Sequence, residues 1–278
     1  MRPYFSIIIP TLNEERDLPK LLRSLRRQSF ADFELIVVDG ESVDKTKEIV
    51  ERYQKLLPRL KLVTSEKKGP GVQRNMGAKK ASGKYLIFFD ADVEIPEEFL
   101  EGIHYYIIRH KPSFLTTWVY VDSVVSGDTV IALGVNMALE FAKSIGKPAV
   151  PGFNFIVKRQ VFNKVKGFDE NLKLSEDMDL AGKICNEGYD LEILKEPKLK
   201  MSLRRLRTEG TLKIFRKFML ANLYTLLKGP ITTQIFDYQM GGHVHRKRRK
   251  KRLNLMEWNN YIKNMEKLGK RLNKFLVS

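Results

Sequence analysis

The stretch YLIFFDADVEIP, residues 85–96, joins a run of apolar residues to two aspartates, Asp90 and Asp92, that stand one residue apart. The apolar run predicts a buried strand, and the acids come at its carboxyl end. A carboxylate is costly to bury unless a positive group meets it. This strand end is therefore predicted either to face water or to hold a cation.

Polar residues also end or follow two earlier strands of the predicted fold. Residues 4–9 and 33–39 are apolar runs of strand length, and they lead into Thr11 to Glu14 and into Asp39 to Asp44. Strands that alternate with helices indicate a mostly parallel sheet with helices on both faces, which is an α/β fold. Ligands of such sheets bind at the carboxyl ends of the strands, so we expect these polar clusters to form one site.

The helices between these strands carry recognisable start signals. Asn13 is predicted to cap the first helix, with Glu14 and Glu15 in its first turn, and Asp44 is predicted to cap the second. Further strands are predicted at 60–65, 84–90 and 113–125, further helices at 69–83, 96–110, 128–146 and 175–189, and a strand, a short helix and a turn within 151–172.

The positive charge of the chain is confined to its C-terminal part. The 278 residues contain 50 Lys and Arg against 33 Asp and Glu, a net charge of +17. Residues 1–197 hold 29 residues of each sign, whereas residues 198–278 hold 21 basic and 4 acidic residues. This distribution predicts an anionic partner for the C-terminal part alone.

Two amphipathic helices are predicted in that basic part, at 211–228 and 253–276, and residues 246–252 are seven consecutive basic residues. A basic amphipathic helix that contains a tryptophan can lie on an anionic membrane surface. The alternative is that its apolar stripe packs on the rest of the protein while the lysines face water. Both interpretations stay open on the sequence alone.

Other features predict a cytoplasmic protein. No stretch approaches 18 uninterrupted apolar residues, and the apolar run near the N-terminus is too short for a secretory signal. The single cysteine, Cys185, excludes an internal disulfide and fits a reducing compartment. We therefore expect a cytoplasmic location, with peripheral attachment to the cytoplasmic membrane face through residues 198–278.

Four motifs together resemble family 2 glycosyltransferases with the GT-A fold. They are SIIIPTLNEE (6–15), VVDGESVDKT (37–46), QRNMGAKKASGKYLIFFDADV (73–93) and GFDENLKLSEDMDLAGKICNEG (167–188). The resemblance covers roughly residues 4–200 and is specific because all four motifs agree in order and spacing.

The resemblance implies a domain organisation. A GT-A catalytic domain is expected at 1–205, with a nucleotide-binding part at about 1–95 and an acceptor part at about 96–205. A basic helical C-terminal extension is expected at 206–278.

The resemblance also implies transfer of a sugar from a nucleotide-sugar donor, with a UDP-sugar favoured over a GDP-sugar. The diphosphate of such a donor leaves with extra negative charge, which a divalent cation can neutralise. Mg²⁺ and Mn²⁺ prefer oxygen ligands and need only one or two carboxylates beside the phosphates. In the D-x-D motif of this family the second acid binds the metal, so Asp92 is the expected ligand of Mn²⁺ or Mg²⁺ and Asp90 its companion.

The nucleotide-binding residues follow from the same resemblance. Asp39 is expected to hydrogen-bond the base, and Arg74 to face the nucleotide, although a solvated helix arginine is the alternative for Arg74. Arginines after the last strand suit the diphosphate through their planar donors. The remaining residues expected to contact the donor are Pro10, Thr11, Asn13, Glu14, Arg204 and Arg207.

The acceptor hydroxyl needs a proton acceptor as it attacks the sugar, and the resemblance assigns this role to Asp177, with Glu176 as its neighbour. The alternative is that these acids only favour the start of a helix, which is the sole role expected for Asp179. A single base and a direct attack imply inversion at the anomeric carbon.

The sequence does not reveal the acceptor. It also leaves the sugar open, because residues 151–154 stand where relatives often have a Gly-Gly pair beneath the donor sugar. The acceptor is expected to be a glycan hydroxyl or a lipid-linked group, and a polyprenyl-phosphate sugar synthase at the membrane face is one alternative. A nucleotidyltransferase and a nucleic-acid-binding protein are alternatives of other classes. The latter is disfavoured because the excess charge is confined to the C-terminal part.

Overall fold

The computed structural model describes residues 2–121, 123, 126–172, 174–204, 207 and 241–242. Nearly all of the predicted C-terminal extension, with its two helices and the basic run at 246–252, lies outside these residues. The domain boundary near residue 205 therefore stays a prediction.

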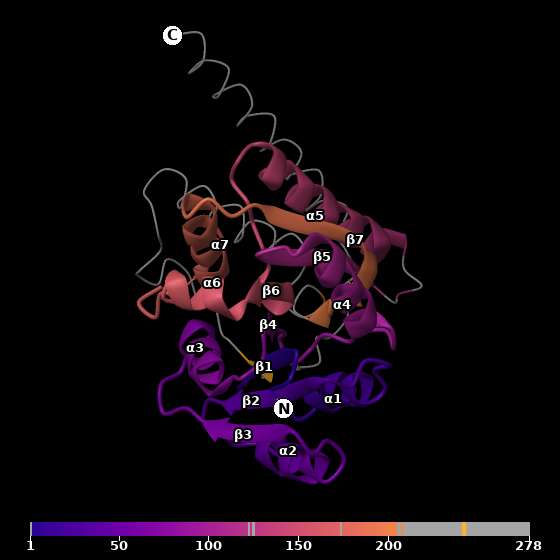
Figure 1. The fold of residues 1–278 in the computed structure, drawn as a ribbon. Coiled ribbons are helices and arrows are strands. Elements are labelled where there is room, and N and C mark those ends of the chain that lie inside the picture. The colour runs from indigo at the N-terminus through magenta and orange to yellow at the C-terminus, as the bar shows by residue number, and fades with distance from the viewer. Residues whose placement is uncertain are drawn as a thin grey trace, which may run out of the picture. The chain divides into compact units, whose positions relative to one another are not determined.

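Seven strands and seven α-helices make up the described fold (Figure 1). The strands are β1 (Phe5–Thr11), β2 (Phe33–Asp39), β3 (Leu60–Thr64), β4 (Tyr85–Phe88), β5 (Phe114–Tyr120), β6 (Phe155–Lys158) and β7 (Leu191–Lys200). The helices are α1 (Leu18–Arg26), α2 (Thr46–Gln54), α3 (Pro70–Lys80), α4 (Phe99–His110), α5 (Ser126–Ser144), α6 (Arg159–Lys164) and α7 (Glu176–Asn186), with a 3₁₀ turn η1 (Gly152–Asn154).

The strands form one sheet in the order β3-β2-β1-β4-β6-β5-β7. The first four positions are parallel, β6 runs antiparallel to both of its neighbours, and β5 and β7 are parallel to each other. The prediction of an α/β fold with a mostly parallel sheet is confirmed.

Helices cover both faces of the sheet because the central strands are apolar on both sides. Ile7 and Ile9 pack in a core with α1, α2 and α4, whereas Ile8 between them packs in a second core with α3, α6 and α7. Figure 1 shows these two groups of helices on opposite sides of the strands. Successive residues of a strand point to opposite faces, so a continuous apolar run serves both cores.

Some predicted boundaries differ from the structure. The strand predicted at 113–125 ends at Tyr120, and the helix predicted at 128–146 begins at Ser126. Within the described residues, none of the helices is both long and apolar enough to cross a bilayer.

Candidate active site

The polar strand ends meet at one edge of the sheet. Thr11 and Asp39 are directly paired in the register of β1 and β2, and the Phe89 N–H donates to Ile8 O at 3.1 Å, so Asp90 follows on the next parallel strand. We call this shared edge the carboxyl rim. At the rim, Asp39 lies on one side of β1 and the Asp90–Asp92 segment lies on the other side of β1.

Asp39 is fully buried at the rim and is held by several donors. Its carboxylate accepts the Ser42 N–H at 2.9 Å and the Thr11 hydroxyl at 3.2 Å, and Lys47 Nζ lies 3.7 Å away. Pro10 directly precedes Thr11 at the end of β1. These residues, expected to line the base and ribose, therefore adjoin one another.

The predicted helix cap at Asn13 is wrong. Helix α1 begins only at Leu18, and Asn13 has a positive φ of 56°. Its backbone N–H donates to Ser42 Oγ at 2.8 Å, and its Oδ1 accepts the Val43 N–H at 2.8 Å. Asn13 thus ties the loop after β1 to the loop after β2 instead of starting a helix, which leaves Glu14 outside the helix as well.

Arg74 lies at the centre of the first of two charged clusters. Its side chain is only 4% exposed, so the alternative of a solvated helix arginine is excluded. Nη2 donates to Asp90 Oδ1 at 2.8 Å and Nη1 to Glu176 Oε1 at 2.7 Å. The Arg74 guanidinium therefore joins the D-x-D motif after β4 to the acidic start of α7. Arg74 and Glu176 are 102 residues apart in the chain.

Asp177 lies beside this cluster. Its Oδ2 accepts the N–H of Gly152 at 2.7 Å, and burial raises its pKa to about 6. The Glu176 carboxylate adds to that rise in the pKa, whereas the Arg74 guanidinium and the Gly152 N–H oppose it. A carboxyl group that titrates near neutral pH has the properties of a general base.

Gly152 has no side chain, which allows the Arg74 guanidinium to lie against the backbone at this position. A Cβ at Gly152 would lie 2.7 Å from Arg74 Nη2 and 2.8 Å from Nη1. Because Asp90 and Glu176 hold the guanidinium in place, it cannot move aside without losing an ion pair. The segment that stands in place of the relatives' Gly-Gly pair is therefore packed directly on the charged cluster.

Gly152→Ala is expected to lower the free energy of unfolding by about 1–3 kcal/mol, the usual cost of overpacking a rigid site. Urea denaturation measures this change. Gly182→Ala is the matched control, because nothing lies within 4 Å of a Cβ in that part of α7. Alanine should stabilise that helix by up to about 1 kcal/mol. Equal effects at the two glycines would contradict the packing described here.

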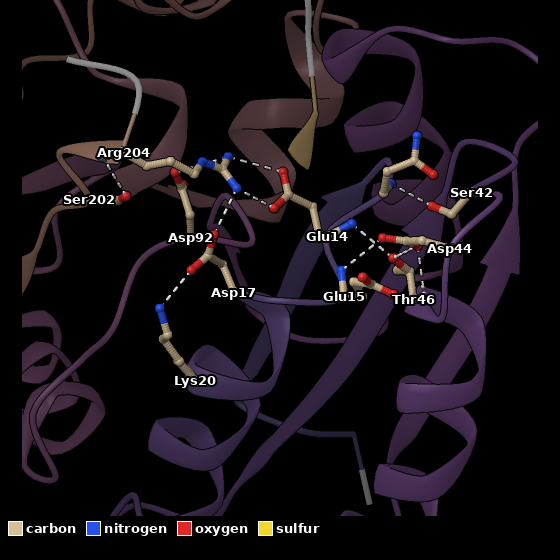
Figure 2. A network of polar contacts seen from close by, with 11 residues as sticks. Glu14, Glu15, Asp17, Lys20, Ser42, Asp44, Thr46, Asp92, Ser202 and Arg204 are labelled. Atoms are coloured by element: carbon tan, nitrogen blue, oxygen red, sulfur yellow. Dashed lines mark hydrogen bonds and ion pairs between the residues drawn. The ribbon is translucent and has the colours of Figure 1, made fainter. Parts of the chain in front are cut away.

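Arg204 forms the second charged cluster (Figure 2). Its Nη1 donates to Glu14 Oε2 at 2.7 Å and to Asp17 Oδ2 at 2.8 Å, and its Nη2 lies 3.2 Å from Asp92 Oδ2. Burial raises the pKa of Glu14 to about 7 against the opposing effect of Arg204, and burial likewise raises the pKa of Asp92. The sequence pattern does not predict Asp17 for this cluster, because an acid just before an apolar helical stripe is an ordinary helix-start signal.

The D-x-D residues fit a divalent cation. Within the described residues no group of three or more His, Cys, Asp or Glu side chains could hold a metal ion. Asp90 and Asp92 nevertheless supply two carboxylates, and Mg²⁺ or Mn²⁺ bound beside phosphates needs no more. In this structure the Asp92 carboxylate faces a positive group, because Arg204 Nη2 lies 3.2 Å from its Oδ2.

Arg207 lies apart from the Arg204 cluster. Its exposed side chain donates to Asp128 Oδ2 at 2.7 Å and to Ser123 Oγ at 3.3 Å, at the beginning of α5. Of the two arginines expected at the diphosphate, the structure thus brings only Arg204 to Asp92. The role expected for Arg207 stays a prediction.

Two glycines that lie far along the chain from the rim residues, Gly241 and Gly242, contact the loop after β1. The Gly242 N–H donates to Leu12 O at 2.9 Å, and Gly241, with a φ of +91°, lies so close that a Cβ would be 2.4 Å from the same oxygen. Only glycine fits this approach. No sequence motif indicates this contact, because it joins segments about 230 residues apart.

The fold and this rim define a class of protein. The structure matches S. aureus TarS residues 1–349 with a TM-score of 0.58 and 25% identity, over 82% of this chain and 73% of that chain. It matches the mannosyltransferase PcManGT from Pyrobaculum calidifontis with a TM-score of 0.60 and 22% identity, over 79% and 65%. The fold is thus that of GT-A glycosyltransferases, as predicted.

The chain belongs to glycosyl transferase family 2, whose family model matches residues 6–166. Among curated proteins, it is 39% identical over 114 residues to the poly(ribitol-phosphate) beta-N-acetylglucosaminyltransferase TarS of Staphylococcus aureus, covering 40% of this chain and 20% of that protein. It is 39% identical over 95 residues to the GalNAc(5)-diNAcBac-PP-undecaprenol beta-1,3-glucosyltransferase of Campylobacter jejuni, covering 34% and 31%. The chain thus spans less than half the length of these relatives.

Proposed function

We propose that this chain transfers a sugar from a nucleotide-sugar donor to an acceptor, with inversion at the anomeric carbon. The observation that carries the proposal is that Arg74 and Arg204 bring the D-x-D motif together with the acidic start of α7 and with the loop after β1. The groups that we propose to bind the donor thereby lie at one rim with a carboxylate whose pKa is raised.

The reaction follows from the chemistry of these groups. Asp177 takes the proton of the acceptor hydroxyl as its oxygen attacks the anomeric carbon. A bond forms between that oxygen and the carbon while the bond from the carbon to the diphosphate oxygen breaks, and its electron pair leaves with the nucleoside diphosphate. Arg204, released from Glu14, stabilises the charge on the departing diphosphate. Attack from the side opposite the leaving group gives inversion.

Asp92 and Asp90 are proposed to hold Mn²⁺ or Mg²⁺ beside the donor diphosphate. When bound, the ion supplies Lewis-acid stabilisation of the leaving group. The complex of PcManGT with GDP-Man and Mn²⁺ supports this assignment, as does the pair of carboxylates at the rim.

The proposed donor is a UDP-sugar, with a GDP-sugar second. TarS 1–349 has been solved with UDP and with UDP-GlcNAc, which supports UDP, while the GDP-Man complex of PcManGT represents the other choice. The proposed acceptor is a glycan hydroxyl or a lipid-linked group, in line with the undecaprenol-linked substrate in the name of the Campylobacter relative.

A thermal-shift screen of UDP, GDP and their sugars, with and without Mn²⁺, tests the donor and the metal together. Asp92→Ala is expected to abolish the metal-dependent part of the shift, because it removes the main ligand. At a donor concentration of 100 times Kd, the lost stabilisation can reach about 2.7 kcal/mol. Glu94→Ala, which removes a half-buried acid paired with Lys200, is the matched control and should keep the full shift.

Two results would exclude the proposal. Release of pyrophosphate instead of nucleoside diphosphate would indicate a nucleotidyltransferase. Salt-sensitive binding to DNA without any response to nucleotide sugars would indicate a nucleic-acid-binding protein.

We further propose that the enzyme is cytoplasmic and that residues 198–278 attach it to an anionic membrane surface, where a lipid-linked acceptor would be met. The confined excess of positive charge supports this. A full-length chain that stays at the bottom of a flotation gradient with anionic vesicles at low salt would contradict it.

A further inference from the structure

Gly241 and Gly242 pack on residues 12–14, the β1 loop, more closely than a residue with a side chain could. The Gly242 N–H donates to Leu12 O at 2.9 Å, and a Cβ at Gly242 would lie 1.7 Å from Asn13 O. A Cβ at Gly241 would lie 2.4 Å from Leu12 O, and the φ of +91° at Gly241 also favours glycine. These nearest partners are backbone atoms, so a larger residue would have to move the loop itself.

The β1 loop is also held by residues that follow β2 and by Arg204. The Asn13 Oδ1 accepts the Val43 N–H at 2.8 Å, and the Glu14 N–H donates to Thr46 Oγ1 at 2.8 Å. Figure 2 shows Glu14 between Thr46 and Arg204, whose Nη1 donates to Glu14 Oε2 at 2.7 Å. The glycine pair adds a contact to the backbone of the same loop, so segments from three parts of the chain meet there.

The β1 loop is bonded to residues that are expected to contact the donor. Asn13 and Glu14 belong to the loop itself, and a Cβ at Gly242 would lie 3.2 Å from Glu14 Oε2. The Asn13 N–H donates to Ser42 Oγ at 2.8 Å, and the Ser42 N–H donates to the Asp39 carboxylate at 2.9 Å. Two hydrogen bonds therefore connect the part of the loop that the glycine pair covers to the residue expected at the base of the nucleotide.

The backbone of the β1 loop depends on such contacts. Asn13 has a φ of 56°, a left-handed value that a residue other than glycine keeps only when its surroundings hold it. Residues after β2 hold the N–H and the side chain of Asn13, while Gly242 covers its carbonyl group. Gly242 is itself buried, so this contact is shielded from water. The conformation of the loop therefore depends on the glycine pair as well as on the neighbouring loop.

We propose that Gly241 and Gly242 are positioning residues, which hold the β1 loop in the conformation that binds the nucleotide-sugar donor. The inference rests on the proposed function, because that function places Asn13 and Glu14 at the donor. A loop that is already held loses less conformational freedom when a ligand binds, so the glycine pair strengthens donor binding. The described contacts of the pair fall on the β1 loop rather than on Asp177, so the chemical step should not depend on it.

Calorimetric titration of the full chain with UDP and with GDP, in the presence of Mn²⁺, tests the inference. Gly242→Ala is expected to raise the Kd of the nucleotide that binds the wild type by about tenfold or more, because the loop is then no longer held in place. Gly134→Ala in α5 is the matched control and should bind like the wild type, since nothing lies within 4 Å of a Cβ there. An unchanged Kd for Gly242→Ala would overturn the inference alone, and tighter binding would show that the pair blocks the site. A wild type that binds neither nucleotide would overturn the proposed function as well.

Steady-state kinetics separate positioning from a loss of folded protein. Gly241→Ala is expected to raise the KM of the nucleotide sugar that the thermal-shift screen selects, while kcat stays near the wild-type value. Gly188→Ala, just after α7, is the matched control: its φ of +84° carries the same backbone cost, but nothing lies within 4 Å of a Cβ. The difference between the two variants therefore reports the contact with Leu12. A lower kcat with an unchanged KM would indicate fewer folded molecules and would contradict a positioning role.

Hydrogen exchange of the wild-type chain tests the same coupling without any substitution. If the glycine pair favours the donor-binding conformation, the donor must in turn favour the contact of the pair with the loop, because coupling between two sites is reciprocal. UDP, or GDP if only GDP binds in the titration, should therefore slow exchange in the peptide that contains the Gly242 N–H bonded to Leu12 O. Exchange that is unchanged or faster with the nucleotide would overturn the inference.

Discussion

Asp177→Asn is expected to bind a nucleotide-sugar donor like the wild-type chain and to transfer the sugar about 10²–10⁴-fold more slowly, the usual contribution of a general base. Asparagine has the same shape, and its amide oxygen can still accept the Gly152 N–H that Asp177 accepts at 2.7 Å. The substitution therefore removes the proton acceptor and keeps the contact with Gly152, and it loses only the bond that the second oxygen accepts from the Met178 N–H at 2.9 Å.

Two measurements separate binding from chemistry. The thermal shift with the donor reports binding, and release of nucleoside diphosphate from a donor that shifts the wild type reports turnover. Asp179→Asn is the matched control, since Asp179 lies in the same helical turn and is paired with Lys183 at 2.7 Å. Turnover of Asp177→Asn at the wild-type rate would exclude Asp177 as the base.

The pH dependence gives a second test of the same residue. Burial raises the pKa of Asp177 to about 6, and the base works only when its carboxyl group is deprotonated. The value of kcat/KM should therefore rise with pH through about 6 and level off above it. A rate that falls over this range would show that the group acts as an acid instead.

Arg74→Met is expected to lower the free energy of unfolding by about 3 kcal/mol, at the low end of the cost of removing one partner from a buried ion pair. The loss leaves Glu176, whose side chain is 12% exposed, without its partner, whereas Asp90 is 40% exposed and can regain water. Urea denaturation measures the change. A free energy within about 0.5 kcal/mol of the wild type would contradict the central role of Arg74.

A surface pair provides the comparison for this prediction. Arg59 and Asp32 form an ion pair at 3.1 Å with both side chains about half exposed, so Arg59→Met should cost less than about 1 kcal/mol. Arg74→Met has a further expected effect, because the guanidinium lowers the pKa of Asp177. In the variant that pKa should rise, so the increase in kcat/KM should move to a higher pH.

The fold class and the composition of the rim could both be predicted from the sequence. The apolar runs of the central strands predicted a parallel sheet, since a strand buried on both faces must be apolar on both sides. Acids and hydroxyls at the ends of those runs predicted the rim, because parallel strands end at one edge. Four motifs in one order then indicated the family. Each of these features is formed by residues close together in the sequence, so the sequence pattern is enough to predict it.

The pairing of the charged side chains could not be predicted and follows from the packing of the chain. Arg204 meets Glu14 and Asp17 across more than 185 residues, and Arg74 meets Glu176 across 102. Asn13 resembles a helix cap in sequence, yet it bonds to the neighbouring loop at Val43. In each case the physical reason is the same: electrostatic partners and burial depend on how distant segments pack, which local sequence patterns do not specify.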